Sequence, residues 1–192
     1  MRLAPFLIFS SAILLGAVLS GCATRPQRPD PIADYLTFLR ENPGADLHGA
    51  DEKAAIQRFQ NFLSRFTEEK LLTDTRQVYA PQAFFNDTLK TVRGSAAIEK
   101  YFLETLKNTD EITVDFADVA RSGNDYYFRW VMDVRFKKFH RGKIARTIGV
   151  THVRFNRAGQ VILHQDYWDS TQGLFEYVPV IGDAIRFIKA RL

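Results

Sequence analysis

Two strand-like segments joined by a tight turn dominate the second half of the chain. They run from Thr147 to Asp169, with the turn at residues 156–159, Asn-Arg-Ala-Gly. Because successive side chains of a strand point to opposite faces of its sheet, every second residue shares a face. One face of the second strand then carries an imidazole, a carboxylate and an indole in a single row, made by Ile162, His164, Asp166 and Trp168. Such a row predicts the polar end of a pocket.

The clearest alternation in the chain lies just upstream, over residues 126–137. Apolar side chains occupy one face and mostly polar side chains the other, as an antiparallel sheet with one covered face requires. The apolar face is formed by Tyr126, Phe128, Trp130, Met132, Val134 and Phe136. Further strands are predicted near residues 112–116, 144–155 and 83–87, the last with a hairpin partner at 89–92.

Apolar residues recur at helical spacing in four other places. The spacing predicts helices over about 52–66, 68–78, 95–107 and 181–191. The expected N-caps of the first three are Asp51, Thr67 and Ser95. The order of the elements predicts an α+β fold, in which a curved antiparallel sheet wraps around helices and encloses a cone-shaped cavity.

The first 21 residues have the layout of a secretory signal, with a basic start and an apolar run over residues 3–19. The run is shorter than the roughly 20 apolar residues that a membrane-spanning helix needs. The next four-residue motif, Leu19-Ser20-Gly21-Cys22, resembles the lipobox of bacterial lipoproteins, which are cut before the cysteine and acylated on it. The alternatives are an uncleaved anchor and a chance cysteine. Because Ala23 follows the cysteine, the resemblance implies an outer-membrane lipoprotein of the cell envelope that faces the periplasm.

Three regions follow from this pattern. Residues 1–21 are the expected signal peptide. Residues 22–50 begin with the lipidated cysteine and a proline-rich tether, and include a short helix over 32–40 that we expect to lie on the domain as a strap. Residues 51–192 form the expected folded domain.

Composition narrows the function classes. The formal charge of +4 is spread along the chain, so nucleic acid is not an expected partner. Cys22 is the only cysteine, which excludes an internal disulfide. A two-ligand metal site at His164 and Asp166 is a weak alternative, since no further spacing of His, Cys and Asp supports zinc, and no cofactor is expected.

Two stretches carry a family resemblance. The first is Tyr79-Ala80-Pro81-Gln82-Ala83-Phe84-Phe85-Asn86-Asp87 with Gly94 and Ile98, and the second is Val150-Thr151-His152-Val153-Arg154-Phe155-Asn156 with Gly159 and Val161. They resemble the two halves of the nuclear transport factor 2-like superfamily, and the SnoaL-like and ketosteroid isomerase branches are closest. The resemblance covers about residues 51–192 and implies the cone fold, also called a cystatin-like roll. This fold hosts isomerases, hydrolases, cyclases and plain binding proteins.

The resemblance transfers to the site one residue at a time. Asp87 matches the strand aspartate that moves the proton in ketosteroid isomerases. The second carboxylic acid of those enzymes falls near Thr151, and their helix tyrosine falls near Phe59, which has no hydroxyl. Both oxyanion donors therefore depart from the pattern, which argues against steroid isomerisation because losing such donors costs orders of magnitude in rate.

Each candidate residue has a structural alternative. Asp87 is either a base whose pKa is raised in an apolar pocket or a cap on the turn before Thr88. His164 and Asp166 are either an acid–base or ligand-orienting pair, or a buried hydrogen-bonded pair. A link from this pair to Arg129 or Arg146 is a further alternative. The expected pocket wall comprises Phe59, Phe85, Phe128, Trp130, Met132, Thr151, Val153 and Trp168.

Three functions remain open from the sequence. The first is a lipid-anchored module that binds a small, largely apolar ligand, with Asp87, His164 and Asp166 holding its polar end. The second is an isomerase or a hydratase/hydrolase that uses Asp87 or the His164–Asp166 pair for proton transfer. The third is an interaction scaffold in the cell envelope. The resemblance also implies a homodimer formed through the outer face of the sheet.

Two surface features have several interpretations. A basic hairpin tip is either solvated or contacts anionic lipid headgroups, and it contains Lys137, Lys138, His140, Arg141 and Lys143. The last helix is expected to pack on the core; it could instead cover the mouth of the cone, form a dimer contact or touch the membrane.

Overall fold

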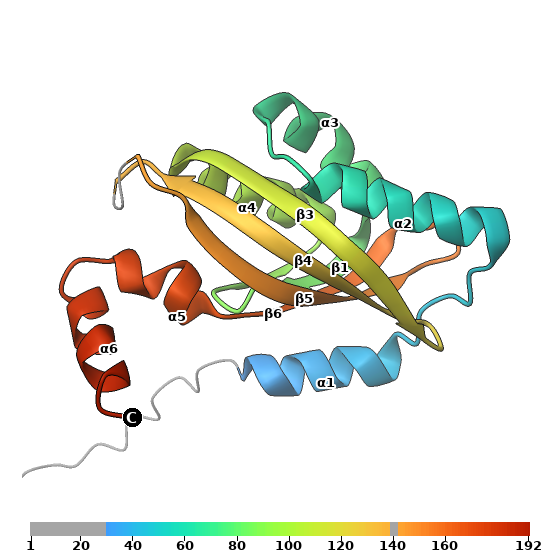
Figure 1. Cartoon of the computed structure of the whole chain (residues 1–192). Coiled ribbons are helices and arrows are strands. Elements are labelled where there is room, and N and C mark those ends of the chain that lie inside the picture. Colours follow the sequence, from blue (N-terminus) through green and yellow to red (C-terminus); the bar gives the residue numbers. More distant parts are fainter. Residues whose placement is uncertain (1–29, 139–141) are drawn as a thin grey trace, which may run out of the picture. The chain divides into compact units, whose positions relative to one another are not determined.

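The computed structural model describes residues 30–138 and 142–192 (Figure 1). The expected signal peptide, the acylated Cys22, the first part of the tether, His140 and Arg141 lie outside the described residues. The elements are α1 (Pro31–Glu41), α2 (Gly49–Leu63), α3 (Glu68–Val78), β1 (Tyr79–Asn86), β2 (Thr91–Arg93), α4 (Ser95–Lys107), β3 (Thr109–Ser122), β4 (Asp125–Phe136), β5 (Ala145–Phe155), β6 (Val161–Trp168), α5 (Ser170–Gly173), the 3-10 helix η1 (Phe175–Tyr177) and α6 (Ile181–Lys189). Among these helices none has the length and apolar character to cross a membrane.

The six strands form one curved, unclosed sheet in the order β2-β1-β6-β5-β4-β3 (Figure 1). Strands β3 to β6 are a continuous antiparallel meander, and β2 is the antiparallel hairpin partner of β1. The predicted α+β class is therefore confirmed. One pairing differs from the antiparallel expectation, because β1 lies parallel to β6. The parallel pairing places Phe85 of β1 directly beside His164 of β6.

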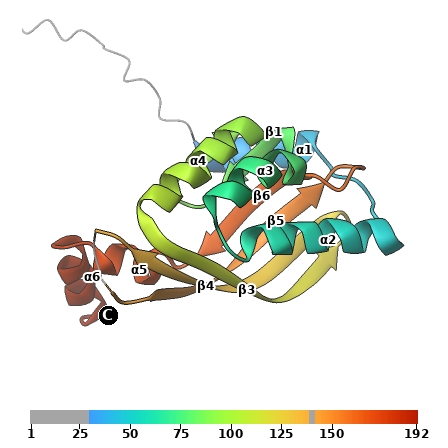
Figure 2. The ribbon, with the colours of Figure 1, turned by 90° about the horizontal axis from the view of Figure 1, so that it is seen from above.

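Helices α2, α3 and α4 cover one face of the sheet (Figure 2). The main core lies in this layer, where Phe59 and Phe62 of α2 and Leu71 of α3 are at most 1% exposed. They pack against inward-facing aromatic side chains of the sheet, such as Phe85 and Phe128. Residues Pro31–Leu192 form one compact unit that contains this core, so the unit has the buried apolar surface it needs to fold by itself.

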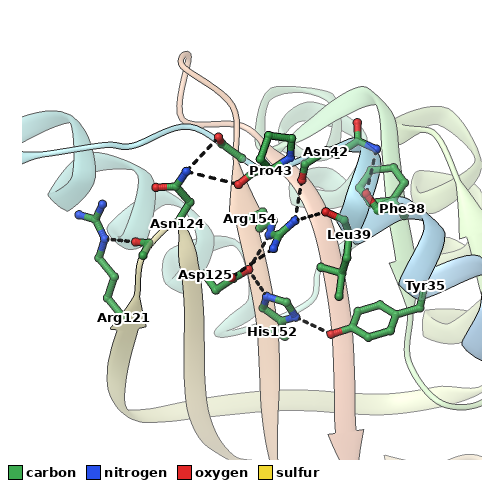
Figure 3. A network of polar contacts seen from close by, with 12 residues as sticks. Tyr35, Phe38, Leu39, Asn42, Pro43, Arg121, Asn124, Asp125, His152 and Arg154 are labelled. Atoms are coloured by element: carbon green, nitrogen blue, oxygen red, sulfur yellow. Dashed lines mark hydrogen bonds and ion pairs between the residues drawn. The ribbon is translucent and has the colours of Figure 1, made fainter.

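Helix α1 lies on the opposite face of the sheet. It corresponds to the short helix over 32–40 that was expected to lie on the domain as a strap. Its Phe38 packs against Phe84 of β1 and Leu163 of β6, and the two phenylalanine rings are 5.4 Å apart between centroids. A polar network also holds the helix (Figure 3). The Tyr35 hydroxyl is 2.8 Å from Nδ1 of His152, and Arg154 Nη1 donates to the carbonyl oxygens of Leu39 and Asn42, at 2.7 Å each.

Asp125 anchors that network at the start of β4 (Figure 3). Its Oδ1 accepts from Nε2 of His152 at 2.6 Å and from Nε of Arg154 at 2.5 Å. The outer sheet face through which a homodimer was expected is thus covered by α1 over β1 and β6.

The helix starts partly differ from the sequence prediction. Thr67 caps α3 as expected, since its hydroxyl accepts from the amide of Lys70. Asp51 is wrong as an N-cap, because α2 begins at Gly49, one turn earlier than its apolar pattern suggests. Ser95 is also wrong, because Gly94 occupies the N-cap position of α4 with a φ of 86°. A Cβ at this glycine would lie 2.9 Å from the carbonyl oxygen of Pro81, so a residue with a side chain would clash there.

Candidate functional site

An apolar cavity of about 160 Å³ lies between the inner face of the sheet and helices α4 and α5. One wall is the apolar row of β4, namely Trp130, Met132, Val134 and Phe136. Tyr101, Phe102 and Thr105 of α4 form the facing wall. The three residues singled out for chemistry, Asp87, His164 and Asp166, all line this cavity. The alternating pattern of β6 places His164 and Asp166 on one face of the sheet, and Asp87 reaches the cavity from the end of β1.

The predicted pocket wall is partly corrected. Five of its residues line the cavity: Phe85, Trp130, Met132, Thr151 and Trp168. The other three, Phe59, Phe128 and Val153, are 0% exposed and belong to the solid core instead. Helix α2 packs on the sheet at this end, and the rings of Phe59 and Phe128 meet at 4.6 Å. Close packing of helix and sheet leaves no space there.

Asp87 has both of the roles that the sequence left as alternatives. Its Oδ1 accepts hydrogen bonds from the backbone amides of Leu89 and Lys90, at 3.0 and 2.9 Å, so it caps the β1–β2 turn. Its Oδ2 accepts a hydrogen bond from the hydroxyl of Tyr101 and faces the cavity. The neighbouring Trp168 donates its indole N–H to the backbone carbonyl of Asp87 at 2.7 Å, which fixes the turn to the end of β6.

Burial raises the pKa of Asp87 above its ordinary value of 3.8. The hydrogen bonds from Tyr101 and from the turn amides act in the opposite direction, and the nearby charge of Asp166 adds to the increase. Burial and the adjacent carboxylate also raise the pKa of Tyr101. A carboxyl group with a raised pKa in an apolar cavity is a usual sign of a functional position, because charge is costly there.

His164 and Asp166 form a hydrogen-bonded pair that extends across the sheet. Nε2 of His164 lies 3.0 Å from Oδ1 of Asp166, and Nδ1 of His164 lies 2.9 Å from the hydroxyl of Tyr79. Thr151 of β5 donates to the same Oδ1 of Asp166 at 2.5 Å and accepts the indole N–H of Trp130 at 2.8 Å. Five side chains from four strands, β1, β4, β5 and β6, are thereby linked.

A single neutral tautomer of His164 satisfies both hydrogen bonds that its ring makes in this network. Tyr79 donates to Nδ1 of His164, and the protonated Nε2 of His164 donates to Asp166. Within the described residues, both side-chain hydrogen bonds that reach Asp166 end on Oδ1. Its Oδ2 is thus left as an acceptor for a bound molecule in the cavity that it lines.

The alternative link to arginine is wrong. Arg129 pairs with Asp118, and Arg146 pairs with Asp133, both on the outer face of the sheet. The positions of the two oxyanion donors of ketosteroid isomerases are also occupied differently. Thr151 donates a hydrogen bond from its hydroxyl group to Asp166, and Phe59 is buried in the core.

Two tyrosines complete the site, and neither was predicted as a site residue. Tyr79 was expected to break the helical pattern and to begin the first resemblance stretch, and it is 0% exposed and bonds His164. Tyr101 lies on α4, 14 residues from Asp87. Within the described part of the chain, no group of three His, Cys, Asp or Glu side chains is arranged to hold a metal ion.

Comparisons with known proteins agree with this architecture. The family model of the SnoaL-like domain matches residues 56–164. A candidate SnoaL-like polyketide cyclase from Shewanella putrefaciens is 15% identical, with a TM-score of 0.53 over 73% of this chain and 99% of its own. A candidate isomerase of the SnoaL-like family from Agrobacterium tumefaciens is 16% identical, with a TM-score of 0.50 over 63% and 99%.

A third solved structure is a protein of ketosteroid isomerase-like fold from Catenulispora acidiphila, in complex with trimethylamine. It is 16% identical, with a TM-score of 0.54 over 62% of this chain and 88% of its own. Among curated proteins none matches the sequence. Identities this low establish the fold and leave the reaction and the ligand open. The family model covers more than half of the chain, and the protein therefore belongs to the SnoaL-like domain family.

Proposed function

We propose that this protein binds a small, largely apolar molecule in its cavity and holds the polar end of that molecule at Asp87, His164 and Asp166. The observation that carries the proposal is the position of these three groups on one otherwise apolar cavity of about 160 Å³. An engineered apolar cavity of about 150 Å³ in another protein holds benzene, so the expected ligand has the size of one ring with a short substituent.

The ionisable residues that line the cavity indicate which polar group the ligand should carry. The described lining residues include Asp87, Asp166 and His164 but no lysine or arginine. Asp166 Oδ2 is an acceptor without a protein donor in the described chain, and the partly buried Asp166 lines the cavity, so a hydrogen-bond donor on the ligand would stabilise the complex. The ligand should therefore carry a donor such as a hydroxyl or amine. The relative from Catenulispora acidiphila is in complex with trimethylamine, a smaller molecule that carries an amine, which supports the binding of small amines by this fold.

The cavity provides its own fluorescent reporters. The chain has two tryptophans, Trp130 and Trp168, and both line the cavity. We expect titration with 4-ethylphenol to change the tryptophan emission saturably. 4-Ethylanisole has the same ring but no hydroxyl proton, and it should bind roughly tenfold more weakly because it cannot donate a hydrogen bond to the carboxylate.

Two variants of one strand test whether the signal comes from the cavity. Val134→Phe places a ring into the cavity and should abolish binding, whereas Val131→Phe makes the same change on the outer face of β4 and should leave binding unchanged. The proposal fails if both variants bind 4-ethylphenol like the wild type, or if the wild type shows no saturable change.

Acid–base catalysis is the second candidate function, and the raised pKa of Asp87 favours it. A base in an apolar cavity would exchange the protons next to the carbonyl of a small ketone. Deuterium exchange into cyclohexanone, followed by NMR, should be faster with the wild type than with Asp87→Asn if the site is catalytic. Equal exchange rates would leave binding as the function.

We further propose that the chain is a lipoprotein anchored through Cys22 at the periplasmic side of the outer membrane. The support is the lipobox-like motif at residues 19–22 behind a secretory signal. Cells grown with labelled palmitate should incorporate the label into the wild type and not into Cys22→Ser. Equal labelling of the two proteins would contradict the anchor.

A further inference from the structure

Helix α6 packs with its polar side toward the rest of the protein. Gly182 is its one buried residue, and a Cβ there would lie 2.1 Å from the carbonyl oxygen of Glu176. Arg186 donates to that same carbonyl at 2.8 Å, and Lys189 pairs with the Glu176 carboxylate at 2.5 Å. The expectation that this helix packs on the core is therefore wrong, because polar contacts to the η1 segment hold it.

The apolar side of α6 faces outward as a result. Ile181 is 49% exposed, Phe187 58% and Ile188 57%, and Leu192 beyond the helix is fully exposed. At 3.6 residues per turn Ile181, Ala184, Ile188 and Leu192 lie on one side of the helix, the half-buried Ile185 lies at its edge, and Phe187 lies about a third of a turn away. A surface helix normally turns this side to the core. Exposed apolar side chains gathered on one helix face mark a surface that meets an apolar partner.

The surroundings of this face are basic. Residues 181–192 contain Arg186, Lys189 and Arg191 against one acidic residue, Asp183. Figures 1 and 2 place α6 at the same end of the unit as the end of β4 and the start of β5. The exposed residues Lys138 and Lys143 lie shortly after β4 and shortly before β5.

We propose that α6 lies on an anionic phospholipid surface, with Ile181 and Ile188 among the acyl chains and Arg191, which stacks on Phe187 at the border of this face, at the headgroups. Apolar side chains bordered by lysine and arginine are the composition of helices that lie in the membrane interface. The helix has nine residues and is about 14 Å long, too short to span a membrane.

A second copy of the chain fits this face less well. Two α6 helices related by symmetry would bring their arginines and lysine close together, and like charges repel. A stable dimer also buries roughly 800 Å² on each partner, which is much more than one side of a helix of this length offers. A membrane requires no such area, because contact through α6 would add to the acyl chains expected on Cys22. Stable membrane attachment generally takes two such signals.

The test uses the chain from Ala23 onward, which keeps the whole compact unit and lacks both the apolar signal and the acylated cysteine. We expect it to sediment with vesicles of phosphatidylethanolamine and phosphatidylglycerol, and much less with phosphatidylcholine vesicles. The double variant Ile181→Asn/Ile188→Asn should bind the anionic vesicles roughly tenfold more weakly or worse. A matched control, Leu72→Asn/Ile148→Asn, changes two residues that are 53% and 69% exposed elsewhere and should bind like the wild type.

Two alanines of the same helix then locate the contact. The chain from Ala23 has no cysteine, so Ala184→Cys and Ala190→Cys can each carry one environment-sensitive fluorophore. Both alanines are exposed, but Ala184 lies among the isoleucines and Ala190 does not. Anionic vesicles should shift the emission of the label at 184 to the blue and change the label at 190 much less.

Three results would overturn the proposal. One is vesicle binding that the α6 double variant leaves intact. Another is an equal shift of both labels, which would place the contact elsewhere. The third is a wild type that binds no vesicles but forms a dimer lost in the double variant, which would assign the face to a second copy of the chain.

Discussion

Asp87 combines a structural and a chemical role in one carboxyl group. One oxygen caps the turn between β1 and β2, while the other accepts the hydroxyl of Tyr101 at the cavity. Burial raises its pKa, so the folded protein holds this proton more tightly than the unfolded chain does. Because the apolar cavity disfavours the charged form of Asp87, ionisation of this group lowers the stability of the folded protein.

We predict that Asp87→Asn stabilises the fold at neutral pH. As pH rises above about 4, the unfolded chain loses this proton first, and the folded state loses stability until the pH passes its own, higher pKa. Asparagine never carries the charge and keeps the amide contacts of the turn. The urea midpoint of the variant should therefore lie above that of the wild type near pH 7, and the difference should shrink toward about pH 3.

Asp118→Asn is the matched control for that measurement. The hydrogen bond from Arg129 lowers the pKa of Asp118, so removing its charge should bring no gain at neutral pH. A lower urea midpoint for Asp87→Asn than for the wild type near pH 7 would show that the charged form of Asp87 is not disfavoured in the folded protein.

Sequence periodicity predicted part of the site at this scale. His164 and Asp166 are two apart on a strand, so a shared face follows from geometry, and the structure shows both on the cavity. Tyr79 and Tyr101 depend on how β1 and α4 pack, which no local pattern encodes. The placement of Phe59 and Phe128 in the core also depends on where α2 meets the sheet.

Among the elements, α1 has the most specific attachment. Phe38 fills a small apolar patch on the outer face of the sheet, and His152, Asp125 and Arg154 hold the helix through polar contacts. Burial lowers the pKa of His152 below its ordinary 6.5, although the neighbouring Asp125 acts in the opposite direction. The folded protein therefore favours the neutral imidazole.

This attachment should weaken in mild acid. As pH falls below about 6.5, the unfolded chain takes up a proton on His152 that the folded protein resists, so stability falls with pH. Burial raises the pKa of Asp125, but the hydrogen bonds from Arg154 and His152 outweigh it and lower the pKa overall. The stability that ionised Asp125 contributes is therefore lost only in stronger acid. Urea midpoints should drop between about pH 7.5 and pH 5.5 in the wild type, and less in His152→Gln.

His48→Gln serves as the control, because the side chain of His48 is 73% exposed and lies away from this network. It should show the same pH dependence as the wild type. A His152→Gln variant with undiminished pH dependence would mean that another group is responsible.

The sequence predicted most elements but not all of their relations. The strands of the meander and helices α2, α3 and α4 appear near their expected positions, because their apolar periodicity is regular. The parallel contact of β1 with β6 was not expected, since it joins segments far apart in the chain. The short helices α5 and η1 were not predicted either, because segments of three or four residues carry no periodic signal.

For the molecule as a whole, the motifs of the sequence led to the correct fold family, and the family model confirms it over residues 56–164. The function could not be predicted from these motifs, because one fold hosts many activities. What distinguishes this chain is the combination of two carboxyl groups, one histidine and an apolar wall at a single cavity.

A crystal structure of the protein with 4-ethylphenol tests the proposed ligand binding at this cavity most directly. The ring should lie in the cavity against Trp130 and Trp168, with its hydroxyl within hydrogen-bond distance of Asp166 or Asp87. A structure in which the cavity holds no probe at saturating concentration, or in which the probe sits on another surface, would contradict small-ligand binding at this site.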